Sequence, residues 1–238
     1  GTSNYFVQKG HGKENSICDT DEAWMIASAL IKFDTRLAMH QLASVLTSIN
    51  PDSSINKYLN FSPGSEISSP INQKPMAAWT CWNIFSVSKD FEFLTQAFPL
   101  LEAYHNFWYT NYDINDNLWC ENAEGNESAE LNALLYTEKY CLEKISNILG
   151  DTAKSRQYQD QTEFIRDNFN NHFYSENLQQ YCDISILSDT IIISNTAAGY
   201  CMWSGLSSYT IAAKYANNTE QLLTSGHYKD LFASGKYN

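Results

Sequence analysis

Apolar residues recur at helical spacing along almost the whole sequence, and this pattern restricts the fold more than any other feature. Residues 21–32, DEAWMIASALIK, open with two acidic residues and then place Trp24 and Leu30 on one face. A period of 3.6 residues is typical of an amphipathic helix. The same period returns in most later segments, so the sequence predicts an all-α protein.

Capping residues and prolines set the expected helix boundaries. Aspartates favour helix N-termini, proline favours the first turn, and glycine ends helices. On these signals the expected helices cover 21–32, 34–48, 76–87, 90–98, 99–112, 129–149, 151–171, 208–215 and 219–225. Residues 50–73 are rich in Ser, Pro, Asn and Gly and are expected to form a long loop, whereas 184–193 has some strand character.

One expected helix and one repeat indicate how the helices are arranged. Residues 99–112 are apolar on two sides, as in a helix between two layers. The triplets Trp119-Cys120-Glu121 and Tyr181-Cys182-Asp183 each follow an aromatic helix end and lie 62 residues apart. Helical hairpins that repeat at this period suggest a toroid or a solenoid. The triplets then either line a central cavity or only close a hairpin.

Composition excludes several classes of partner. The formal charge of -12 argues against nucleic acid, and no run of 18 apolar residues is present to span a membrane. Six cysteines are scattered singly without histidine pairs at ligand spacing, so we expect buried thiols and neither a metal nor a cofactor. The chain begins with Gly and no signal peptide precedes it, so we expect a segment of a longer protein, of unspecified compartment.

Aromatic residues make up 14% of the sequence, and three glutamates gather beside two of them. Aromatic faces hold sugar rings but also fill cores, and the core is the commoner use. Glu121, Glu124 and Glu127 lie in WCENAEGNESAELNALLY, just ahead of an expected helix. Carboxylates beside aromatic rings are what glycoside cleavage needs, although a solvated surface turn has the same composition.

Five segments together resemble one family. In chain order they are DEAWMIASALIKFDTRLAMHQLASVL, NQKPMAAWTCWNIF, DFEFLTQAFPLLEAYHNFWYTNYDINDNLW, LNALLYTEKYCLEKISNILGD and TAAGYCMWSGLSS. They are similar to the W-D-x-x-F, S-Q-P-P, Y-H-x-W-W, L-N-A-x-L-Y and P-L-W-A-G-L-A segments of α/α-toroid glycosidases of family 63 and of trehalase. The resemblance covers residues 21 to about 225 and implies one incomplete (α/α)6 toroid domain over 1–238.

The resemblance implies an inverting hydrolase of α-glucosides, in which an acid protonates the leaving oxygen and a carboxylate activates water. In such relatives the acid is the Asp of E-S-G-x-D, and the base lies beyond this chain's last residue. Here Glu127-Ser128 matches the E-S, but Ala129 follows directly, without the glycine and the aspartate. Eight or nine helices are expected where a closed toroid needs twelve.

The candidate residues follow from these matches. Glu127 is the stand-in acid, whose pKa we expect burial to raise, or a loop glutamate placed near a helix N-terminus. The candidate carbohydrate-binding residues are Glu22, Trp24, Gln73, Trp79, Trp119 and Trp203. Each has a structural alternative, a first-turn acid for Glu22 and core packing for the tryptophans.

Three functions stay open on this reading. The first is an active glycosidase for α-glucosides or oligosaccharides. The second is a catalytically inactive carbohydrate-binding or scaffold remnant, and the third is an α/α-toroid sugar epimerase, for which a pair of inner histidines is not evident. Missing hairpins would leave inner helices exposed, which predicts self-association.

Overall fold

The computed structural model describes residues 17–60, 74–188, 190–193 and 196–224. The described helices are α1 Thr20–Leu30, α2 Thr35–Leu46, α3 Ala77–Ser88, α4 Phe91–Tyr112, α5 Ala129–Ile148, α6 Thr152–Phe173, α7 Ala197–Trp203 and α8 Tyr209–Thr224. The described strands are β1 Ile17–Asp19, β2 Tyr58–Asn60, β3 Asn126–Glu127, β4 Tyr174–Ser175, β5 Gln180–Ser185 and β6 Thr190–Ile193. The all-α prediction is confirmed, with small antiparallel sheets added between helices.

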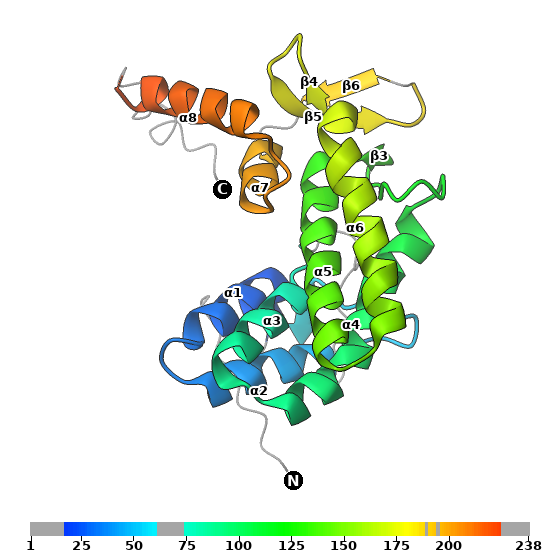
Figure 1. Cartoon of the computed structure of the whole chain (residues 1–238), viewed down its shortest axis with the longest axis vertical. Coiled ribbons are helices and arrows are strands. Elements are labelled where there is room, and N and C mark those ends of the chain that lie inside the picture. Colours follow the sequence, from blue (N-terminus) through cyan, green and yellow to red (C-terminus); the bar gives the residue numbers. More distant parts are fainter. Residues whose placement is uncertain (1–16, 61–73, 189, 194–195, 225–238) are drawn as a thin grey trace.

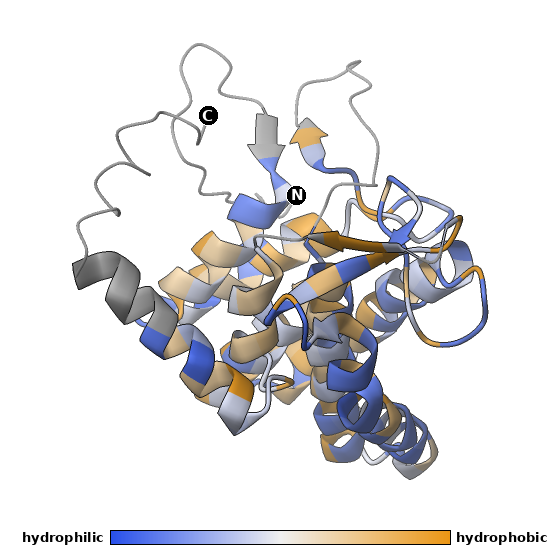
Figure 2. Ribbon diagram, turned by 90° about the horizontal axis from the view of Figure 1, so that it is seen from above, coloured by the Kyte–Doolittle hydropathy of each residue, from blue (hydrophilic) through white to orange (hydrophobic). Residues whose placement is uncertain are grey.

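The helices form two layers of consecutive hairpins (Figure 1). α1 contacts α3, α3 contacts α5 and α5 contacts α7, which makes these four the inner layer. α2 contacts α4 on the other side, and the long α6 packs along α5. Each outer helix returns the chain to the same end, so all four inner helices begin at one edge of the molecule. Figure 2 shows hydrophobic and hydrophilic residues alternating along single helices, as expected where one face packs inward.

Two hydrophobic clusters hold the layers together, and α5 contributes to both. Leu135 and Leu142 join the cluster formed with α1 to α4, whose largest members are Trp24, Tyr104 and Trp108. The second cluster packs α5 against α6, β5 and α7. Each fully buried Leu or aromatic side chain stabilises the fold by roughly 1.5–3 kcal/mol. α5 is therefore the central element of the described chain.

Several helix boundaries confirm the sequence prediction. The carboxylates of Asp34, Asp90 and Asp151 accept hydrogen bonds from backbone N–H groups in the first turns of α2, α4 and α6. Gly150 follows α5 with a φ of 83°, a conformation that favours glycine. The five cysteines whose side chains are described are buried free thiols, as expected.

Four segments differ from the sequence prediction. Pro99 lies inside the single helix α4, where its exposed ring interrupts one hydrogen bond while buried residues on either side, such as Leu94 and Leu101, keep the axis continuous. Residues 197–203 form α7, where no helix was expected, and 209–224 form one helix rather than two. Part of the expected 50–73 loop is strand β2, which pairs with β1; 61–73 lies outside the described residues.

The two aromatic-Cys-acid triplets meet at the start of α5. The Asp183 carboxylate accepts a hydrogen bond from the Ala129 amide at 2.8 Å. Asn132, one turn further on, bonds both the N–H and the carbonyl oxygen of Cys120 at 2.8 Å. Both triplets are buried, so their observed role is to hold the N-terminus of α5 in place.

Candidate functional site

The N-terminal ends of α1, α3, α5 and α7 are joined by one polar network, here called the inner rim. Lys74, just ahead of α3, is its centre: its backbone N–H donates to Asp21 of α1 at 2.7 Å. Its ammonium lies 3.0 Å from a carboxylate oxygen of Glu130, in the first turn of α5, and donates to the Tyr200 hydroxyl of α7. Thr196, at the start of α7, donates to the same Glu130 carboxylate. One lysine thus links all four inner helices.

The hydrogen bonds and charges at the inner rim shift the pKa values of Lys74 and Asp21. Burial acts to lower the pKa of Lys74, but its bonds to Tyr200 and Glu130 outweigh this and raise the pKa. Burial raises the pKa of Asp21, partly offset by hydrogen bonds from Lys57 and from the Lys74 amide. Lys74 is therefore a permanent cation in contact with a carboxylate and a phenol, a combination that can bind hydroxyl groups in several geometries.

Two tryptophans adjoin this network. Trp79 of α3 and Trp203 of α7 pack edge to face, with ring centroids 5.2 Å apart and planes at 65°. Trp203 is 43% exposed although it is a large apolar side chain. Its ring lies one helical turn after Tyr200, so an exposed aromatic surface and hydrogen-bonding groups lie side by side on the inner rim.

Glu138 of α5 fixes the N-terminus of α3 next to the inner rim. Its carboxylate is fully buried on α5 and accepts hydrogen bonds from the Ala78 and Trp79 amides at 2.8 and 2.9 Å. Burial raises its pKa to about 7, although these bonds at the N-terminus of α3 act to lower it. The position of Trp79 therefore depends on a side chain of the neighbouring inner helix.

The sequence-derived binding candidates fall in different places. Trp79 and Trp203 come together at the inner rim, as described. Glu22 lies half-buried in the first turn of α1, beside Asp21. Trp24 has no exposed surface and packs against Tyr104 in the core, which leaves no free ring face in the described structure. Gln73 lies outside the described residues.

Glu127 and Trp119 form a separate cluster between α5 and α6. Glu127 accepts a hydrogen bond from Asn117 at 3.0 Å and is bonded to the imidazole of His172 at 2.6 Å. The His172 ring stacks on Trp119 with centroids 4.9 Å apart, and Trp119 is 5% exposed. His172, on α6, thus contacts both Glu127 and Trp119.

The expected rise in the pKa of Glu127 is wrong. Burial does act in that direction, but hydrogen bonds from His172 and Asn117 stabilise the ionised form and lower the pKa. The neighbouring Glu121, across an isolated β-bridge, is buried with one carboxylate oxygen unpartnered among the described residues. Burial and the charges of Glu127 and Asp113 raise the pKa of Glu121. The more acidic carboxyl of the pair is therefore Glu127.

Replacing Glu127 by Gln should destabilise the fold by about 1–2 kcal/mol at pH 7, because a charged buried acceptor of two hydrogen bonds is lost. A lowered folded-state pKa contributes stability above the unfolded-state pKa that is lost as pH falls through the folded-state pKa. The difference between the two proteins in urea unfolding should accordingly shrink on acidification. Equal stability at pH 7, together with loss of glycoside hydrolysis, would instead support Glu127 as a catalytic acid.

Sequence reasoning missed Lys74, Glu130 and Tyr200. Lys74 was visible as the residue that departs from the family's Q-P-P, and Glu130 directly precedes the L-N-A-x-L-Y match. The ion pair between Lys74 and Glu130 joins residues 56 positions apart, so no local sequence pattern indicates it. The described residues contain no group of three or more metal-ligating side chains. None of the described helices is long and apolar enough to cross a membrane.

Paired helical hairpins in two layers, with polar and aromatic side chains gathered where the inner helices begin, define the class of α/α-toroid proteins. Two family profiles match: the mannosylglycerate hydrolase MGH1-like glycoside hydrolase domain over residues 17–121, and the glycosyl hydrolase family 63 C-terminal domain over 113–233. The chain belongs to glycosyl hydrolase family 63. The resemblance and the incomplete toroid inferred from the sequence are confirmed.

Solved structures agree on the fold. The family 63 mannosylglycerate hydrolase of Thermus thermophilus, in complex with glucose, matches with a TM-score of 0.76 and 13% identity over 91% of this chain and 72% of that one. A family 78 rhamnosidase of a Bacillus species matches with a TM-score of 0.65 and 12% identity, over 92% of this chain and 28% of its own. A search of curated proteins found no match.

Proposed function

We propose that the inner rim binds an α-glucoside or a related oligosaccharide, with Trp203 as the stacking surface. The observation that carries this proposal is the exposed Trp203 ring packed against Trp79 beside the Lys74–Glu130 ion pair. Carbohydrate sites combine an aromatic face for the C–H surface of a sugar with charged groups for its hydroxyls. Glucose is a suitable first probe because the family 63 enzyme of Thermus thermophilus was crystallised with it.

Hydrolysis at the inner rim would require two free and suitably placed carboxyl groups. An inverting mechanism needs a protonated carboxyl and a second carboxylate on opposite sides of the bond, about 6.5–9.5 Å apart. At the inner rim Glu130 is held by Lys74 and Thr196, and Asp21 by Lys57 and the Lys74 amide. Both carboxylates are engaged in contacts that join helices, which favours the binding function over the catalytic one.

Tryptophan fluorescence titrated with glucose and with maltose oligomers tests the binding function. Trp203→Ala should weaken binding about tenfold, because loss of one aromatic contact removes roughly 1 kcal/mol or more. Glu130→Gln should weaken it by a similar factor, since the ion pair with Lys74 is lost. Aryl α-glucosides added to the same proteins would show whether binding is accompanied by turnover.

Trp82→Phe is the matched control for this titration. Trp82 is a partly buried tryptophan on the same helix as Trp79, packed against Phe85 and outside the inner rim. Its substitution should change the fluorescence intensity but not the affinity. Unchanged affinity in both Trp203→Ala and Glu130→Gln would refute the inner rim as the sugar site.

A further inference from the structure

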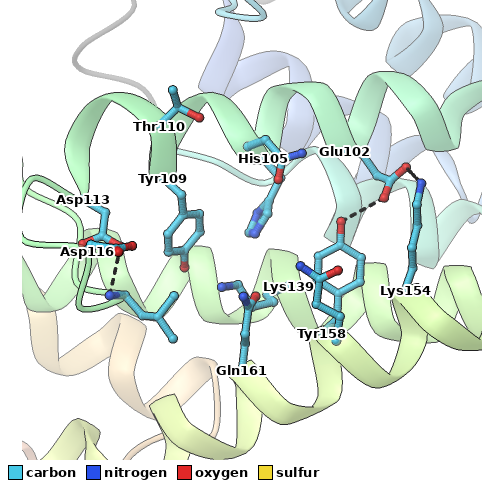
Figure 3. A pocket seen from close by; sticks show the side chains of 13 residues that line it. Glu102, His105, Tyr109, Thr110, Asp113, Asp116, Lys139, Lys154, Tyr158 and Gln161 are labelled. Atoms are coloured by element: carbon cyan, nitrogen blue, oxygen red, sulfur yellow. Dashed lines mark hydrogen bonds and ion pairs between the residues drawn. The ribbon is translucent and has the colours of Figure 1, made fainter.

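A cavity lies on the other side of α5 from the inner rim, between the outer helices α4 and α6. Its volume is about 570 Å³, which is within the range of small-molecule sites. Figure 3 shows His105 and Tyr109 extending from α4 towards Lys139 of α5, with Gln161 and Tyr158 on the α6 side. Lys139 lies nine residues after Glu130, so the cavity and the inner rim are separated by about 14 Å along α5.

The floor of this cavity contains buried polar groups that have no hydrogen-bond partner among the described residues, next to a buried lysine. Lys139 is 1% exposed, its ammonium lies 3.8 Å from the centre of the Tyr109 ring, and no carboxylate of the described chain lies within ion-pair distance of it. Neither imidazole nitrogen of His105, itself 2% exposed, has a partner among the described residues, and neither does the Tyr109 hydroxyl. Buried polar groups are normally satisfied, so two unpartnered side chains beside a lysine without an ion-pair partner in the described chain indicate a missing ligand.

Two of the three carboxylates that line the cavity already accept hydrogen bonds. Glu102 accepts from Lys154 at 2.5 Å and from the Tyr158 hydroxyl at 3.0 Å. Asp113 accepts from the Asn117 and Leu118 amides, one on each oxygen, at 2.9 Å. Asp116 is exposed to water. Free donors at the floor and engaged acceptors at the edge together select a ligand that carries an acceptor, not a cation.

We propose that the cavity between α4 and α6 binds a small hydroxylated carboxylic acid, with its carboxylate on Lys139, Tyr109 and His105. The three donors suit one carboxylate group, with a single positive charge opposite a single negative one. Space remains for a polar body, and the amides that line the cavity, Asn106, Gln157 and Gln161, can bond its hydroxyls. A phosphate would place a second negative charge where the described floor offers no second cation.

The protonation states of Lys139, His105 and Tyr109 are compatible with a bound carboxylate. Burial lowers the pKa of Lys139 to about 7, whereas burial keeps His105 neutral and Tyr109 protonated by shifting their pKa values in opposite directions. Cys120 and Asp113 act in the opposite direction to burial and raise the pKa of Lys139. On the α6 side, the titratable groups that line the cavity are Lys154 and Tyr158. A bound carboxylate stabilises the ammonium form, so binding takes up a proton and should weaken above pH 7.

Calorimetric titration of the full chain with D-gluconate, at pH 6 and pH 9, tests the proposal. Binding should be tighter at pH 6 by roughly tenfold or more and should be lost in Lys139→Met. Tyr109→Phe, which removes only an unpartnered hydroxyl, should weaken it severalfold and guards against misfolding of the lysine variant. Lys144→Met, a change of the same kind on α5 but outside the cavity, should retain binding.

The controls separate this site from the inner rim. Gluconate binding should persist in Trp203→Ala. Absence of sugar binding at the inner rim therefore does not contradict the gluconate site, and absence of gluconate binding does not contradict the sugar site. Equal binding of gluconate by wild type and Lys139→Met, or tighter binding of inorganic phosphate than of gluconate, would overturn the assignment.

Discussion

Replacing Glu138 by Leu is expected to destabilise the fold by about 2–4 kcal/mol, because two buried amides at the N-terminus of α3 lose their only acceptor in the described structure. Leu keeps most of the volume, so the loss reports the hydrogen bonds and not a cavity. Glu138→Gln retains one acceptor oxygen and should lose about half as much. Urea unfolding followed by circular dichroism gives the free energies.

The control for this experiment is Glu143→Leu, at a half-exposed position of the same helix. It should change the unfolding free energy by less than about 0.5 kcal/mol, the usual limit for surface positions. Because Glu138 positions the Trp79 amide, Glu138→Leu should also weaken sugar binding at the inner rim. A variant as stable as wild type would contradict the capping role of Glu138.

Lys139→Met is expected to be more stable than wild type by about 1–4 kcal/mol at pH 6, because it removes a buried ammonium that has no ion-pair partner in the described chain. The pKa of Lys139 is near 7 in the folded protein and near 10.5 in the unfolded one. The unfolded state therefore binds more protons between these values, and wild type gains stability as pH rises from 7 to 10. The advantage of Lys139→Met should shrink over the same range.

Glu138, the preceding residue, contributes the opposite slope. Its pKa is raised from 4.5 to about 7 on folding, so the folded state binds the extra proton and stability falls as pH rises from 4.5 to 7. Together the two residues should give wild type a stability minimum near pH 7. The minimum should flatten on its acid side in Glu138→Gln and on its alkaline side in Lys139→Met. Parallel curves for all three proteins would refute both pKa shifts.

The helices were predictable because their causes are local. Periodic apolar residues give one buried face, and aspartates such as Asp34 and Asp151 satisfy the first-turn amides of helices that start directly after them. Pro99 shows the limit of this reasoning, since burial on both sides of it kept α4 in one piece. Trp79 and Trp203 were identifiable as binding candidates only through the resemblance to family 63.

The sequence by itself determined the class of fold, the family and the acidic character of the chain, since each is encoded in periodicity, in the order of motifs or in composition. Tertiary structure alone decided which charges meet: Lys74 with Glu130 across 56 positions, and Glu138 with the amides of α3 across 60. It also turned two successive residues of α5 to different neighbours, because each step along a helix rotates a side chain by about 100°. Glu138 therefore supports the inner rim, while Lys139 forms the floor of the outer cavity.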